Sequence, residues 1–302
     1  MSSIAVSRAA GASLATGNAP SSHRATSRTW WRLLLKDSPA VVALIVLLLI
    51  VVAAILAPVL TPVDPLTTNT RLKAAPLFTP GYPLGTDQLG RDIWSRLLYG
   101  ARLTLTVGIV GAAASAAIGL MIGLIAGYFG GWADTVTMRG LDVLLSFPDI
   151  LLAVVIVAIL GPSLQNALIA VAILGVPFYV RLIRADVLRL RQADFVTAAK
   201  TIGASDRRVI ATHILPNVIA PIIVTASIHV GYLILSAAGL SFVGLGAQPP
   251  SPEWGAMVSS GRDYLLIAPH VVLVPAAAIF IVVLAFNIVG DGLRDALDPK
   301  AR

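Results

Sequence analysis

Long stretches without a charged residue constrain this chain more than any other feature of its sequence. The clearest lies between Arg208 and Glu253, where no Asp, Glu, Lys or Arg occurs. A helix needs about 20 apolar residues to cross the hydrocarbon core of a membrane. Only 12% of the residues are charged and 57% are hydrophobic, whereas a soluble domain carries about 25% charged residues. The sequence therefore predicts an integral membrane protein.

The apolar windows predict an all-α membrane protein with six transmembrane helices. They lie between Asp37 and Asp64, between Arg102 and Asp134, at Leu141–Leu160, at Ala167–Ile183, at about Leu215–Leu240, and between Asp263 and Asp291. The segment GPSLQN separates the third from the fourth, because glycine and proline interrupt helices. The predicted organisation is a disordered tail (1–28), a first helix with an extracytoplasmic loop (29–99), a core of five helices (100–291) and a short tail (292–302).

The distribution of Lys and Arg predicts that both termini lie in the cytoplasm. With the N-terminus inside, 16 of the 22 basic residues fall on the cytoplasmic side. Cytoplasmic loops of membrane proteins carry an excess of such residues. The outer side then holds the remaining ones, Arg71, Lys73, Arg91, Arg96, Arg102 and Arg262.

The segment VTAAKTIGASDRRVIATHILPN, from Val196 to Asn217, is one of the few charged stretches and follows the fourth span. It predicts a helix, a turn at Gly203 and a second helix that begins at Ser205. Glycine readily adopts the positive φ that ends a helix. Ser205 is a favourable N-cap, and Asp206 places negative charge in the first turn.

This segment has three interpretations: a solvated basic loop, a DNA-binding helix-turn-helix, or a docking site for another protein. The DNA-binding motif has a similar outline, but here it lies between two membrane spans and lacks a third helix. We therefore expect no contact with nucleic acid. Ala198 and Ala199 are small side chains that allow another surface to approach closely.

The segment TAAKTIGASDRRVIATHILPN resembles the "EAA" loop of permease subunits of binding-protein-dependent ABC transporters, with Thr197 in place of the motif's glutamate. Four further segments are similar to the C-type permease of the dipeptide/oligopeptide/nickel branch. They are PLGTDQLGRDIWSRLLYGAR (83–102), AGYFGGWADTVTMRGLDVLLSFP (126–148), LSFVGLGAQPPSPEWGAM (240–257) and LAFNIVGDGLRDALDP (284–299). The resemblance covers the chain from about Trp31 to its end.

This resemblance implies a six-helix permease that imports di- or oligopeptides across the bacterial inner membrane by alternating access. The alternative is the same machinery with nickel or another small solute. The implied partners are a homologous second permease, two ATPase subunits that bind ATP-Mg, an extracytoplasmic solute-binding protein and membrane lipid. The implied ATPase-coupling loop comprises Thr197, Ala198, Ala199, Gly203, Ala204, Ser205, Asp206, Arg207 and Arg208.

The residues themselves agree with a subunit that is not an enzyme and holds no cofactor. The chain has no G-x-x-x-x-G-K-[ST] phosphate loop, so ATP must be hydrolysed by a partner. We see no catalytic triad, carboxylate pair or metal-ligand cluster. A remote alternative is an autonomous secondary transporter, but acidic and basic residues are missing from the middle of the spans, which disfavours ion coupling.

Two polar residues inside the spans, His229 and Asn287, are candidates to line a pore; the competing interpretation is hydrogen bonding between packed helices. Asp149 has two interpretations: a place near the membrane interface, or a deeper one that needs a polar partner which the sequence does not identify. The second span carries a stripe of small residues that predicts close helix packing rather than solute contact. These are Gly108, Gly111, Gly119, Gly123 and Gly127.

Overall fold

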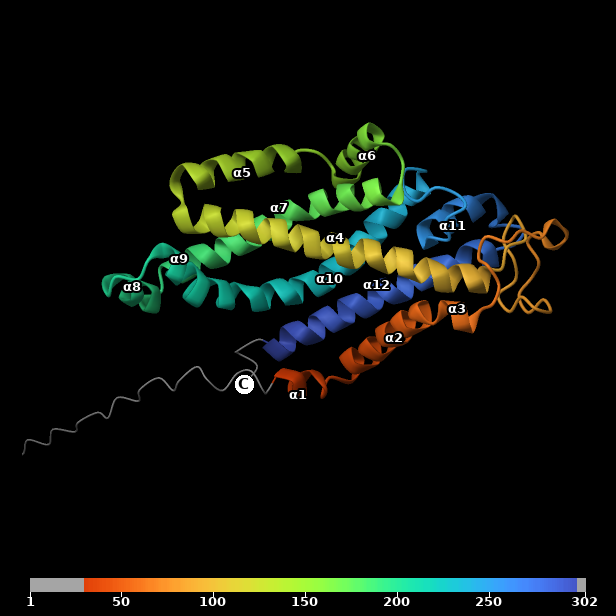
Figure 1. Cartoon of the computed structure of the whole chain (residues 1–302), viewed down its shortest axis with the longest axis horizontal. Helices are drawn as coiled ribbons and strands as arrows, with labels where there is room; N and C mark the ends of the chain where they lie inside the picture. Colours follow the sequence, from red (N-terminus) through yellow and green to blue (C-terminus); the bar gives the residue numbers. More distant parts are fainter. Residues whose placement is uncertain (1–29, 298–302) are drawn as a thin grey trace, which may run out of the picture.

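The computed structural model describes residues 30–297, which form an elongated bundle of helices with no extended β-strand (Figure 1). In chain order the helices are α1 (Trp30–Leu34), α2 (Ser38–Ile55), α3 (Ala57–Leu60), α4 (Ile93–Phe129), α5 (Gly131–Leu145), α6 (Asp149–Leu160), α7 (Leu164–Arg191), α8 (Asp194–Thr201), α9 (Asp206–Val209), α10 (Leu215–Phe242), α11 (Trp254–Gly261) and α12 (His270–Leu297). The predicted all-α class is confirmed. The predicted tail 1–28 and residues 298–302 lie outside the described residues.

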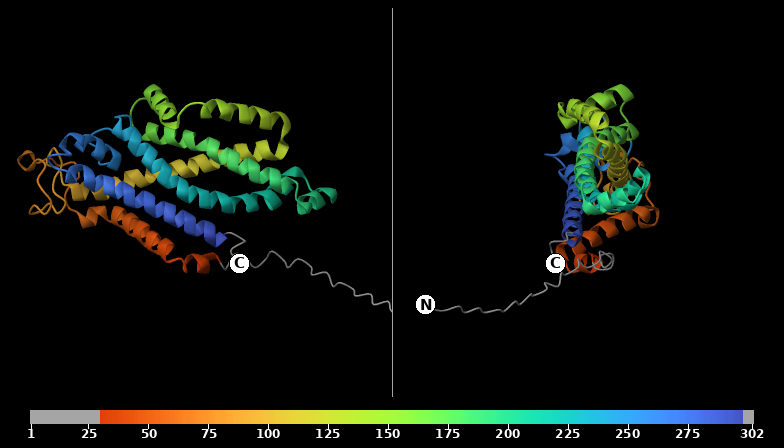
Figure 2. Two further views of the ribbon diagram at one scale, coloured as in Figure 1. Left: turned by 180° about the vertical axis from the view of Figure 1, so that it is seen from behind. Right: turned by 90° about the vertical axis from the view of Figure 1, so that its left-hand side faces the viewer.

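Within residues 30–297, five helical segments are long and apolar enough to cross a membrane. They are α2, α4, α7, the continuous path from Asp206 to Phe242, and α12. The bent pair of α5 and α6 makes a sixth if it is counted as one span. Figure 2 shows α2 at the edge of the bundle, where it packs along α12.

The third predicted span, Leu141–Leu160, is wrong as a single helix. Helix α5 ends at Leu145, α6 begins at Asp149, and the two axes are bent by 91°. Pro148 explains the break, because proline disfavours a helical conformation in the residue before it and lacks a backbone N–H. The fourth predicted span, Ala167–Ile183, is correct in place but short, since α7 continues to Arg191.

The fifth predicted span matches α10, although the helical path begins earlier, at Asp206. A π-helical segment, Ile210–Ile214, joins α9 to α10, and the N–H of Leu215 bonds to the carbonyl of Ile210. Pro216 follows in the first turn of α10. A proline has no N–H for a normal helical bond and its ring crowds the carbonyl four residues before it. The wider π turn accommodates it.

Helices α4 and α7 pack closely because α4 presents glycines to α7. The facing pairs are Gly119 with Tyr179, Gly123 with Ile183, and Gly127 with Val187. A Cβ atom added at Gly119 would lie 2.4 Å from the Cβ of Tyr179, which is closer than atoms can approach. The glycine stripe in the second span therefore serves helix packing, as predicted.

The bundle has two distinct ends. One carries α8 and α9, and the other carries the long segment 61–92 together with α11 (Figure 1). We call them the α8–α9 end and the loop end. At the loop end, buried Arg96 of α4 donates hydrogen bonds to the carbonyl oxygens of Pro65 at 3.2 Å, Pro250 at 3.3 Å and Ser251 at 3.2 Å. Its guanidinium also pairs with Asp87 at 3.4 Å. One side chain thus joins both external loops to α4.

Candidate functional site

The helix pair α8–α9 is turned by Gly203, as the sequence predicts. Gly203 has φ of 89°, and the N–H groups of Gly203 and Ala204 bond to the carbonyls of Lys200 and Ala199 at 2.9 and 3.0 Å. These bonds satisfy carbonyls that the end of α8 leaves free. In the described part of the chain, no atom other than those of Gly203 and its two chain neighbours lies within 4 Å of a Cβ built at this position. Only the backbone conformation therefore restricts this position to glycine.

The inner face of this helix pair packs on the bundle. Val196 and Ala199 of α8 and Val209 of α9 are buried in one apolar cluster with Ile183 and Val187 of α7. The predicted pair Ala198 and Ala199 is therefore split: Ala199 faces the protein's own core, and Ala198 is exposed. Of these two small residues, only Ala198 remains on the exposed surface, because adjacent helical residues are about 100° apart.

The outer face contains most of the predicted coupling residues. Exposed are Thr197, Ala198, Gly203, Ser205, Asp206, Arg207 and Arg208, while Ala204 is half-buried. Ser205 is the N-cap of α9, but its side chain makes no capping hydrogen bond. At the tip of the pair, Ile202 is 86% exposed. Sequence reasoning missed Ile202; its signal is a large apolar residue inside a charged stretch.

A polar network joins the helix pair to the end of α4. The hydroxyl of Tyr128 donates a hydrogen bond to Asp206 at 2.5 Å, and the Lys200 ammonium lies 3.4 Å from the same carboxylate. The ammonium also lies 4.9 Å from the centre of the Tyr128 ring. The pKa of Lys200 is raised above its ordinary value, first by its hydrogen bond with the Tyr128 hydroxyl and further by Asp206.

Two ion pairs fix α5 against α7. Arg184 of α7 binds Asp134 of α5 with two nitrogen atoms, one of them at 2.7 Å. Arg181 contacts Asp142 at 2.9 Å, and both of these side chains are exposed. Helix α5 is thus connected to α7 through charged side chains, in contrast with the apolar contact between α4 and α7. Helix α6 instead contacts α7 through an apolar cluster that includes Ala153 and Val157.

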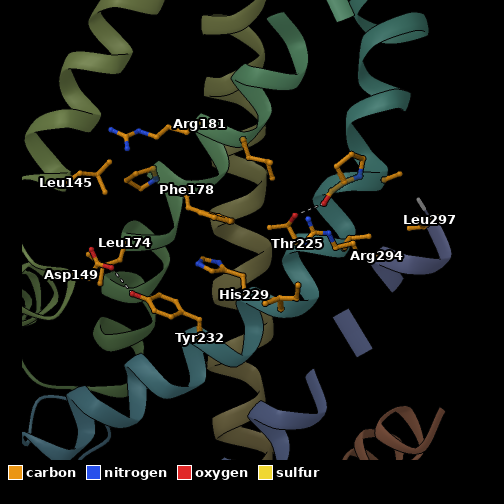
Figure 3. A pocket seen from close by; sticks show the side chains of 16 residues that line it. Leu145, Asp149, Leu174, Phe178, Arg181, Thr225, His229, Tyr232, Arg294 and Leu297 are labelled. Carbon is orange, nitrogen blue, oxygen red and sulfur yellow. Dashed lines mark hydrogen bonds between the residues drawn. The ribbon is translucent and has the colours of Figure 1, made fainter. Parts of the chain in front are cut away.

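A cavity of about 1190 Å³ opens between the α5–α6 bend, α7, α10 and the end of α12 (Figure 3). Its charged and aromatic lining comprises Asp149, Arg181, Phe178, His229, Tyr232 and Arg294. Apolar side chains such as Leu174 and Val224 line much of the remainder. A large, mostly apolar cavity with a few convergent polar groups is typical of a site for a small molecule.

Three rings are stacked along one wall of this cavity. Phe178 and His229 have ring centroids 5.2 Å apart and planes inclined by 19°, and His229 and Tyr232 follow at 5.4 Å and 11°. The Tyr232 hydroxyl donates a 2.7 Å hydrogen bond to Asp149. Tyr232 is the polar partner of Asp149 that the sequence did not identify.

The two predicted pore-lining candidates occupy different environments. His229 lines the cavity, and its Nδ1 atom is buried with no hydrogen-bond partner among residues 30–297. Asn287 donates to the carbonyl of Val283 at 2.8 Å within α12 and is not part of the cavity lining. In the described part of the chain, no three His, Asp or Glu side chains gather to form a metal site.

A bundle of membrane-length helices, with a protruding helix pair at one end and an open cavity on its side, is an arrangement suited to a transport permease. The chain belongs to the family described as binding-protein-dependent transport system inner membrane component, which it matches over residues 119–302. Residues 26–82 match the N-terminal TM domain of oligopeptide transport permease C. The chain is therefore a non-catalytic, multi-pass component of an ABC transporter in the inner membrane, as the resemblance predicted.

Two curated relatives are similar over nearly their whole length. The dipeptide transport system permease protein DppC of Alkalihalophilus pseudofirmus is 49% identical over 91% of this chain and 90% of its own. The glutathione transport system permease protein GsiD of Pectobacterium atrosepticum is 46% identical over 91% of each. Among solved structures, a chain of the inward-facing MetNI methionine ABC transporter superimposes with a TM-score of 0.52 at 21% identity, covering 66% of this chain and 95% of its own. That likeness concerns the fold.

Proposed function

We propose that this chain is one of two permeases of an ATP-driven importer that carries di- or oligopeptides across the cytoplasmic membrane by alternating access. The observation that carries the proposal is the 49% identity to a dipeptide permease over nine-tenths of both chains. The similar glutathione permease narrows the solute class in the same direction, because glutathione is itself a tripeptide. Glutathione is the second candidate solute.

The proposed assembly pairs the chain with a homologous permease, two ATPase subunits that hold ATP-Mg, and an extracytoplasmic solute-binding protein. The absence of a phosphate-loop sequence in this chain supports hydrolysis on partner subunits. Both termini and the α8–α9 end are assigned to the cytoplasm, supported by the 16 basic residues predicted on that side. The loop end then faces the binding protein.

The α8–α9 pair is proposed as the coupling element that docks on an ATPase subunit. Exposed Ile202 supports this role, because it places a large apolar side chain at the tip of the pair, where a partner surface can cover it. Burying such a side chain stabilises a complex by about 1.5–3 kcal/mol. Arg207 and Arg208 lie on the same exposed part of the pair and add a polar rim to the proposed interface.

Reconstitution into liposomes tests the proposal. The complete complex, in liposomes that contain ATP, is expected to accumulate a labelled dipeptide. The chain alone is expected neither to hydrolyse ATP nor to accumulate the dipeptide. In a parallel pull-down, Ile202→Asp should lose the ATPase subunits, whereas the control Leu266→Asp, exposed at the loop end, should retain them. Accumulation by the chain alone under a proton gradient would show a secondary transporter instead.

A further inference from the structure

We propose that Asp149 and Tyr232 form a binding site for the ammonium group of a solute in transit through the cavity. The inference rests on the peptide-import function proposed above and assigns residues to it. Both side chains project into the cavity, Asp149 from the start of α6 and Tyr232 from the middle of α10 (Figure 3).

The hydrogen bond between them leaves the carboxylate available to a ligand. Tyr232 donates to Oδ2 of Asp149 at 2.7 Å, and within residues 30–297 no other group bonds to this carboxylate. Asp149 is exposed to the cavity. Its Oδ1 atom can therefore accept a hydrogen bond from an N–H donor, and a hydrogen bond between two charged groups is about twice as strong as a neutral one.

The stacked rings beside this carboxylate favour a cation. Phe178, His229 and Tyr232 form a nearly parallel stack along the wall. Because His229 lies between the other two rings, Phe178 and Tyr232 each keep one ring face that the stack does not cover. Such a face carries negative partial charge and attracts a cation within about 6 Å. A carboxylate next to aromatic faces therefore provides two independent attractions for an ammonium group.

The other walls favour a zwitterion over a simple cation. Arg181 from α7 and Arg294 from the end of α12 line the same cavity. Arg181 is paired with Asp142, whereas Arg294 has no ion-pair partner within residues 30–297, so its positive charge repels a ligand that carries only positive charge. A peptide has an ammonium group at one end and a carboxylate at the other. When the ammonium group of a peptide binds at Asp149, the peptide's carboxylate shares the cavity with cationic side chains. The volume of the cavity, about 1190 Å³, exceeds the usual range of about 300–1,000 Å³ for sites that bind small ligands.

The test is equilibrium binding to the permease–ATPase complex in nanodiscs without the solute-binding protein, with labelled L-alanyl-L-alanine as the probe. Asp149→Asn is expected to weaken binding about tenfold, which corresponds to about 1.4 kcal/mol. Tyr232→Phe keeps the ring and should weaken binding only a few-fold. The matched control is Asp186→Asn, whose carboxylate pairs with Arg189 and does not line the cavity; it should bind as the unaltered complex does.

A second probe separates ammonium recognition from a structural effect. The N-acetylated dipeptide lacks the ammonium group, so it should bind weakly and equally to the unaltered complex and to Asp149→Asn. Equal binding of the two probes to the unaltered complex, or no binding of either, would overturn the ammonium site. Uptake by the complete transporter is measured alongside equilibrium binding. Failure of the unaltered transporter to import the dipeptide would refute the proposed peptide function. Normal import by Asp149→Asn, with unchanged affinity for the dipeptide, would refute only this site.

Discussion

The hydroxyl of Tyr128, in the last turn of α4, donates a 2.5 Å hydrogen bond to Asp206, in the first turn of α9. Lys200 of α8 lies against both partners. Helix α4 runs from here to the loop end, where Arg96 holds the external loops. We therefore expect displacement of the α8–α9 pair to act on α4, the longest helix in the described part of the chain.

Tyr128→Phe is expected to reduce the solute-stimulated ATPase activity of the reconstituted complex a few-fold while the ATPase subunits remain bound. The change removes the hydroxyl that joins α4 to α9 and keeps the ring beside Lys200. Thr106→Val on the same helix is the control, because the Thr106 hydroxyl bonds only to the carbonyl of Arg102 in its own helix. Equal solute stimulation of the ATPase activity in Tyr128→Phe and Thr106→Val would show that the hydrogen bond between Tyr128 and Asp206 does not couple α9 to α4.

Gly203→Val is expected to uncouple ATP hydrolysis from transport and leave membrane insertion intact. The φ of 89° costs a β-branched residue about 1–3 kcal/mol, and relief of this strain would reorient α9 relative to α8. Gly203→Asn is the matched control, since asparagine tolerates a left-handed conformation. The measurements are solute-stimulated ATPase activity and pull-down of the ATPase subunits. Full stimulation with full subunit binding in the valine variant would exclude α8–α9 as the coupling element.

Arg96→Met is expected to destabilise the loop end. The variant keeps much of the side-chain volume but removes the donors to three carbonyl groups and one contact with Asp87. A cost of about 2–3 kcal/mol is expected, because Asp87 keeps its pairing with Arg91. Thermal unfolding in detergent should show a midpoint lower by about 3–5 °C. Exposed Arg71→Met, in the same external segment, should leave the midpoint unchanged.

Reporter fusions test the orientation. A fusion of a cytoplasm-reporting enzyme after Ser205 should be active, whereas fusions near Asn69 and Pro250 should be silent. Ser205 lies at the α8–α9 end and the other two positions lie at the loop end, on opposite sides of the spans (Figure 1). The Lys and Arg bias supplies the direction. A silent reporter at Ser205 would place the α8–α9 pair outside and remove its proposed contact with ATPase subunits.

Much of the fold can be predicted from the sequence because charge-free windows coincide with the long helices. The failure at Leu141–Leu160 has a physical cause. Apolar composition reports which residues can enter lipid, but it carries no information about the direction of the chain, which Pro148 changes by 91°. Pro148 was visible in the sequence, so the break had a local signal that the apolar window obscured.

The candidate site was only partly predictable. The turn at Gly203 follows from local conformational preference, and its positive φ is confirmed. The pairs Tyr128–Asp206 and Asp149–Tyr232 join residues 78 and 83 positions apart in the chain. Such contacts depend on how the helices are rotated against one another, and the pattern of apolar residues within a membrane span constrains that rotation weakly, since lipid and protein neighbours are both apolar.

The glycines of α4 have a consequence for movement. Tyr179, Ile183 and Val187 of α7 each lie where a side chain at the facing glycine would stand, so their side chains interlock with successive turns of α4. Translation of one helix along the other by less than a full helical turn would bring these side chains against α4 residues that do have a Cβ. We therefore expect α4 and α7 to travel as one rigid body. Conformational change would then occur at interfaces formed by long, flexible charged side chains, such as the interface between α5 and α7. Ion pairs between such side chains can lengthen or exchange partners without a steric barrier.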